Sequence, residues 1–151
     1  MDRTEKILWA TSGVAFIQIM IGFYLSQIEK PMDSVALLIH ISLGILLFIL
    51  AIASYTYTKE IKRLKTLAAV NTSLIAITGL IGMGFISLRA STLYTTYACK
   101  SINPIIHITG RASTLYTTYA PYLHLALAIG IISNYAVMLG IKRTLDLKDK
   151  L

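Results

Sequence analysis

The stretch from Ser34 to Thr58 reads SVALLIHISLGILLFILAIASYTYT and contains no Asp, Glu, Lys or Arg. About 20 mostly apolar residues, each rising about 1.5 Å, cross the hydrocarbon core of a bilayer as a helix. Three further stretches without these charges are long enough: 7–27, 66–88 and 121–141. Because backbone groups in lipid must hydrogen-bond within their own segment, we expect four transmembrane helices.

The composition agrees with this expectation. Of the 151 residues, 56% are hydrophobic and 14% are charged, a balance that excludes a disordered chain. The single cysteine excludes an intrachain disulfide framework. A secretory signal followed by soluble helices is the alternative, but the first stretch lacks a clear small-residue cleavage site and three more follow it. We therefore expect residues 1–151 to form one all-α integral membrane domain.

The basic residues predict the orientation. Ten of the fourteen Lys and Arg residues flank one side of the expected bundle: Arg3, Lys6, Lys59, Lys62, Arg63, Lys65, Lys142, Arg143, Lys148 and Lys150. The other four lie in the two remaining connections: Lys30, Arg89, Lys100 and Arg111. The positive-inside rule then places both termini in the cytoplasm of a multi-pass cell-membrane protein. The net charge of +7 is explained by this topology and by anionic lipid, so we expect no nucleic-acid partner.

Two helix hairpins in an up-down-up-down bundle follow from the short first and second connections. Small residues at several positions allow the helices to approach closely in lipid: Gly22, Gly44, Gly79, Gly82 and Gly84.

The third connection, an outer loop expected over 89–120, contains a perfect repeat. RASTLYTTYA occurs at 89–98 and again at 111–120. Either a recent duplication or an error in the assembled sequence explains it. Its tyrosines suit an interfacial belt or packing against a partner subunit.

A weaker symmetry lies beneath this repeat. Ile-Gly pairs end in Gly22 and Gly82, and histidines follow at His40 and His124. Aligning the two histidines also pairs apolar neighbours: Ala36 with Ala120, Leu43 with Leu127 and Ile45 with Ile129. The chain therefore resembles two related hairpins, and repeat interfaces commonly hold ligands.

His40 and His124 are the candidate functional residues, because ionisable side chains inside membrane spans are rare and usually functional. Both lie near the outer ends of their helices, so they can face each other at similar depth. That arrangement suits the two axial ligands of one haem b. The simpler alternative is that each histidine reaches interfacial water or bonds a neighbouring helix.

The residues around the histidines suit a flat macrocycle. Small side chains lie one turn away on the same helix face: Ala36, Gly44, Ala120 and Ala128. Arg89 and Arg111 flank the outer loop and can pair with haem propionates, or they can serve as interfacial anchors.

Other ligand sets are weaker. His107 can replace one histidine ligand, but the neighbouring Pro104 and Gly110 indicate a turn. Two histidines without carboxylates or thiols make a poor zinc or copper site. Cys99, in the outer loop, is expected to be a free thiol.

At this point the chain resembles one half of the haem A synthase family, which has four helices per half and histidines at the outer ends of the second and fourth helices. The stretch AFIQIMIGFYL, from Ala15 to Leu25, is similar to that family's first helix, with a Gln and a Gly near its outer end. The chain departs from the family at three positions: the family's Glu and Arg beside the second-helix histidine are Leu37 and Ile41 here, and its Arg after the first-helix glycine is absent. The resemblance therefore implies haem binding more than hydroxylation of a haem methyl.

These observations predict a membrane cytochrome b, an electron carrier rather than an independent enzyme. It would exchange single electrons between a quinol or membrane partner and an outer-facing redox protein, within a respiratory or other redox complex. Two alternatives remain open: a cofactor-free accessory subunit of a membrane complex, and a haem-maturation protein.

Overall fold

The computed structural model describes residues 2–27, 35–98 and 107–148, and all its regular elements there are helices. They are α1 (Arg3–Ser26), α2 (Val35–Thr58), α3 (Lys62–Ala98) and α4 (His107–Lys148). Each contains a stretch that is long and apolar enough to cross a membrane: Arg3–Ser26, Val35–Thr58, Lys62–Gly84 and Thr118–Lys148. The expected all-α architecture with four candidate spans is confirmed.

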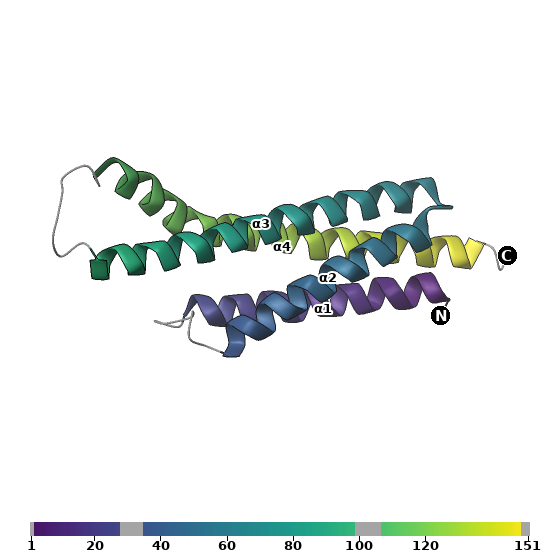
Figure 1. Ribbon diagram of the computed structural model, residues 1–151. Helices are drawn as coiled ribbons and strands as arrows, with labels where there is room; N and C mark the ends of the chain where they lie inside the picture. Colours follow the sequence, from purple (N-terminus) through teal and green to yellow (C-terminus); the bar gives the residue numbers. More distant parts are fainter. Residues whose placement is uncertain (1, 28–34, 99–106, 149–151) are drawn as a thin grey trace.

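The helices form a ring of four neighbours. α1 packs against α2 and α4, and α3 packs against the same two helices. α2 and α4 therefore lie diagonally opposite each other, as do α1 and α3. Both chain ends and the α2–α3 connection lie at one end of the bundle (Figure 1). The basic segments identified in the sequence thus gather at a single end.

The third connection differs from the expected loop over 89–120, because helix extends into it from both sides. α3 continues to Ala98 and α4 begins at His107. At about 1.5 Å per residue, α3 and α4 are about 55 and 63 Å long, against about 36 Å for α1 and α2. Their ends project beyond α1 and α2 at the end opposite the termini (Figure 1).

The physical reason for this difference is that falling hydropathy does not end a helix. Neither Gly nor Pro occurs between residue 85 and the end of α3, so nothing there breaks the backbone pattern. α4 even contains Pro121, and its N-terminal part departs from the line of the rest of the helix (Figure 1). Proline lacks an N–H and crowds the preceding turn, which accounts for such a bend.

The outer surface of the bundle is apolar. Large hydrophobic side chains are exposed on every helix, among them Phe16, Ile49, Leu80 and Ile129. A soluble bundle would place such side chains inside, whereas lipid is a good solvent for them.

The interior is instead rich in small and polar side chains. Ala15, Ala51 and Ala68 are buried, and hydroxyl and amide groups join the helices. Asn134 Nδ2 donates to Asn71 Oδ1 at 2.8 Å, between α4 and α3. In lipid, such close approach and interhelical hydrogen bonds hold helices together.

The two hairpins repeat one burial pattern. Residue numbers in α3 exceed the matching ones in α1 by 60, and those in α4 exceed the matching ones in α2 by 84, the offsets that align Gly22 with Gly82 and His40 with His124. With these offsets, buried residues of α1 match buried residues of α3: Leu8 with Ala68, Thr11 with Asn71, and Ala15 with Ile75. Buried residues of α2 likewise match those of α4: Leu47 with Ile131, Ala51 with Tyr135, Ser54 with Met138, and Thr58 with Lys142. The structure therefore supports the weak symmetry seen in the sequence.

Candidate functional site

His40 and His124 meet across the bundle. Their ring centroids are 6.2 Å apart and the ring planes are inclined by 45°. His40 lies on α2 and His124 on α4, the diagonally opposite helices, and both side chains are half-buried. Two residues 84 positions apart in sequence thus form one site.

Each ring packs against a glycine of its own hairpin. A Cβ atom added to Gly22 of α1 would lie 3.0 Å from His40 Cε1, and one added to Gly82 of α3 would lie 3.3 Å from His124 Cε1. Both are closer than ordinary van der Waals contact. The two glycines lie on α1 and α3, the other diagonal pair of helices, so all four helices border the site.

The backbone of α1 and α3 approaches the rings in a matching way. The Gln18 backbone of α1 lies near the His40 ring, and the Thr78 backbone of α3 lies near the His124 ring. Gln18 and Thr78 each precede their glycine by four residues, one helical turn. The symmetry therefore extends to the environment of both histidines.

Gln18 distinguishes the first hairpin from the second. Its Nε2 donates to the backbone carbonyl of His40 at 2.8 Å. Gly44 provides the space for this amide, since a Cβ there would lie 3.2 Å from Gln18 Nε2. Two buried atoms of this group, Gln18 Oε1 and His40 Nδ1, have no hydrogen-bond partner in the described part of the chain. The sequence offered only a weak sign of Gln18, an amide within an apolar helix.

The remaining predicted site residues are placed as follows. Ala120 is buried, and Ala128 is half-buried. Arg89 lies in α3 and Arg111 in α4, both beyond the candidate spans. The side chains of these two arginines and of His107, the first residue of α4, lie outside what the structure describes, as does Cys99 entirely.

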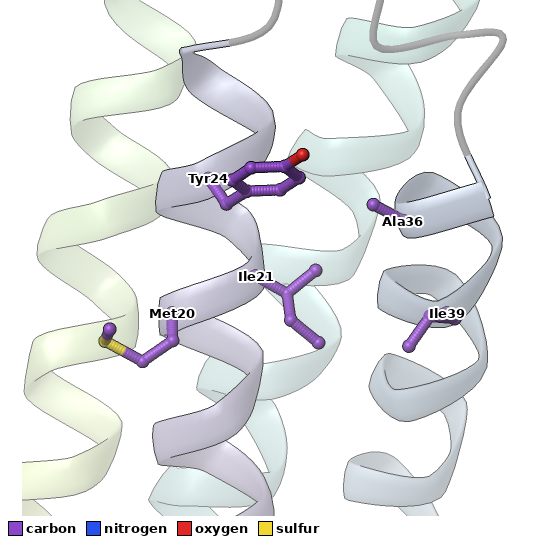
Figure 2. A pocket seen from close by; sticks show the side chains of 5 residues that line it. All are labelled: Met20, Ile21, Tyr24, Ala36 and Ile39. Carbon is purple, nitrogen blue, oxygen red and sulfur yellow. The ribbon is translucent and has the colours of Figure 1, made fainter.

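A shallow apolar groove of about 220 Å³ lies between α1 and α2, beside the histidine site. Figure 2 shows Tyr24 over this groove, Ile21 below it, and Ala36 and Ile39 on the facing helix. Ile21 adjoins Gly22, and Ile39 adjoins His40. The groove is small for a macrocycle and is of the size that holds one ring or acyl chain.

The histidine pair has a spacing that suits a shared metal. A histidine nitrogen lies about 2.0 Å from its metal and about 1.1 Å from its own ring centre, so two opposed imidazoles have centroids about 6.2 Å apart. Among the described residues, no three His, Cys, Asp or Glu side chains come together. A metal here would thus be held by two protein ligands, His40 and His124, the ligand number that haem iron takes in bis-histidine sites.

Gly22 of α1 and Gly82 of α3 present backbone without side chains beside the two rings. Two neutral imidazoles are a donor set that haem iron accepts, and the centroid separation is compatible with it.

Comparisons with known proteins provide no assignment: no protein family, no curated protein and no solved structure matches this chain.

Proposed function

We propose that this protein binds one haem b through His40 and His124 and carries single electrons in the membrane. The supporting observation is the 6.2 Å separation of the two rings across diagonally opposite helices. With both axial positions taken by imidazole, the haem supplies reversible one-electron transfer rather than oxygen chemistry.

The chain's own residues have distinct roles in this proposal. The two histidines bind the iron. Gly22 and Gly82 give the two imidazole rings their packing space, and Gln18 holds α1 against the carbonyl of His40. Arg89 and Arg111, in the parts of α3 and α4 beyond the candidate spans, are the proposed partners of the propionates.

The proposed orientation places both termini in the cytoplasm, with the histidine site near the outer face of the cell membrane. The gathering of the basic segments at one end of the bundle supports this orientation. The proposed partners are other membrane subunits, with a quinol or an outer-facing redox protein exchanging electrons.

A cofactor-free accessory subunit is the second candidate. It is favoured by the ends of α3 and α4 that project beyond α1 and α2, which offer a helical surface to another subunit (Figure 1). Haem maturation, as in the haem A synthase family, is a weaker proposal because Leu37 and Ile41 replace the family's Glu and Arg.

A reduced-minus-oxidised visible spectrum of the detergent-purified protein tests the first proposal. We expect sharp α and Soret bands that are lost or become high-spin in His40→Ala and in His124→Ala. His107→Ala is the matched control and is expected to retain the bands. A featureless wild-type spectrum, after expression with ample haem, would reject haem binding and leave the accessory subunit as the better proposal.

A further inference from the structure

A second buried polar site surrounds Tyr135, far from the histidines. Tyr135 follows His124 by 11 residues on α4, which places it about 16 Å further along the helix toward the end that holds the termini. It is fully buried, with 0% of the residue exposed. Its hydroxyl oxygen has no hydrogen-bond partner among the described residues.

The groups around this hydroxyl come from the other helices. Ser54 of α2 and Asn71 of α3 lie near it, but among the described residues neither is in hydrogen-bonding geometry with it. Thr11 of α1 completes the layer, with its Oγ1 at 3.2 Å from the Oγ of Ser54. Tyr135 matches Ala51 in the hairpin repeat, and both residues are fully buried in the same core cluster.

In the layer formed by Tyr135, Ser54, Asn71 and Thr11, the hydroxyl groups of Thr11 and Ser54 leave hydrogen-bond acceptors unused. Thr11 donates its proton to the carbonyl of Ile7 at 2.7 Å. Ser54 has one proton, which goes either to the carbonyl of Leu50 at 2.9 Å or to Thr11. Both hydroxyl oxygens therefore keep lone pairs without a donor.

The Asn71 amide of this layer leaves a hydrogen-bond donor nearly unused. Asn71 Oδ1 accepts from Asn134, while Asn71 Nδ2 has only the sulfur of Met138, a weak acceptor at 3.8 Å. Together with the Tyr135 hydroxyl, the layer therefore contains both unused donors and unused acceptors.

A buried polar group without a partner is costly in an apolar medium. Water bridges polar groups that face each other beyond direct bonding distance, and two to four such partners are what a buried water needs. We propose that this layer binds one water molecule, hydrogen-bonded to Tyr135, Ser54 and Asn71. This water would join the two hairpins, and it does not depend on haem binding.

The experiment has two measurements on the full chain in lipid bilayers. In solid-state NMR, we expect polarisation transfer from immobilised water to the Tyr135 ring, a signal assigned by its loss in Tyr135→Phe. Tyr122→Phe, which changes an exposed tyrosine, is the matched control and should leave that signal unchanged. Transfer to Tyr135 that is absent in the wild type, or that persists undiminished in Ser54→Ala, would overturn the proposal.

The second measurement is a double-mutant cycle on the unfolding equilibrium. Tyr135→Phe and Ser54→Ala should each lower the folding equilibrium constant about threefold, the usual effect of one hydrogen bond between membrane helices. Because both changes remove partners of the same water, the double variant should lose clearly less than the product of the single losses. Unchanged or greater stability of Tyr135→Phe, or losses that simply multiply, would refute a shared water.

Discussion

The imidazole of His40 occupies the space into which a side chain on Gly22 would project, with only 3.0 Å between Cε1 and the position of an added Cβ. The same relationship joins His124 to Gly82 at 3.3 Å. Each hairpin therefore reserves a backbone position for its histidine ring, and both rings are held toward the bundle axis.

Replacing these glycines by alanine should be less favourable where the histidine ring is closer, so Gly22→Ala should be more destabilising than Gly82→Ala. An alanine in an open helical position stabilises a helix by about 1 kcal/mol relative to glycine. Gly13→Ala in α1 and Gly79→Ala in α3 meet nothing within 4 Å and should show this gain in the free energy of unfolding. Gly82→Ala should show less of it, and Gly22→Ala should show none or a loss. An equal gain at Gly22 and Gly13 would contradict the packing described for His40.

The amide pair of the second hairpin should contribute measurably to stability. Asn134 Nδ2 donates to Asn71 Oδ1 at 2.8 Å and to the carbonyl of Leu67 at 3.3 Å. In membrane proteins such a pair is worth about 0.6 kcal/mol, and up to about 1.7 kcal/mol. A double-mutant cycle of Asn71→Leu and Asn134→Leu should return a coupling free energy in this range. Ser73→Ala, whose exposed hydroxyl bonds only to its own helix at Ala69, is the control and should change little. Strictly additive losses would argue against the pair.

The number of helices could be predicted from the sequence, whereas the ends of α3 and α4 could not. Hydropathy detects the part of a helix that suits lipid, and the uncharged stretches 66–88 and 121–141 lie within α3 and α4. Beyond these stretches the backbone remains helical because no breaker ends α3 and because α4 continues through Pro121. Hydropathy carries no information about that continuation.

In the candidate site, the two histidines could be predicted from the sequence, whereas the residues that pack against them could not. A histidine inside an apolar segment stands out by its chemistry, so His40 and His124 could be identified from the sequence alone. The roles of Gly22 and Gly82 depend on the register of each hairpin, which apolar helices encode weakly. Tyr135 carries no sign of its burial either, because a tyrosine in an apolar segment can face lipid or the bundle core equally well.

Labelling of introduced cysteines should reveal the proposed topology. Glu60 lies in the α2–α3 connection and Lys148 at the end of α4, at the same end of the bundle. In a Cys99→Ser background, Glu60→Cys and Lys148→Cys should react with a membrane-impermeant maleimide only after the cytoplasmic side is exposed. The native Cys99 should react from outside. Labelling of Glu60→Cys in intact cells would reverse the orientation inferred from the basic residues.

Acid should weaken the contact that joins the two termini. Asp2 caps α1 by accepting from the Glu5 N–H at 2.7 Å, and Lys142 Nζ lies 2.7 Å from its other oxygen. Lys142 first, and then the Glu5 N–H, lower the pKa of Asp2 below its ordinary value of 3.8. A carboxyl whose pKa is lower in the folded state stabilises the fold above its ordinary pKa, and this contribution disappears as the pH falls through the folded-state value.

The free energy of unfolding of the wild type should therefore fall as the pH drops below about 4, by less than about 1 kcal/mol, because the Asp2 carboxylate is half-exposed and screened by solvent. Asp2→Asn keeps an oxygen that can cap the helix but removes the charge, so its stability should be lower at neutral pH and should approach that of the wild type in acid. Lys142→Met removes the positive charge that pairs with Asp2 and should therefore reduce the same pH dependence of the unfolding free energy. A constant difference between wild type and Asp2→Asn from pH 7 to 3 would mean that the Asp2 charge contributes nothing to holding α1 against α4.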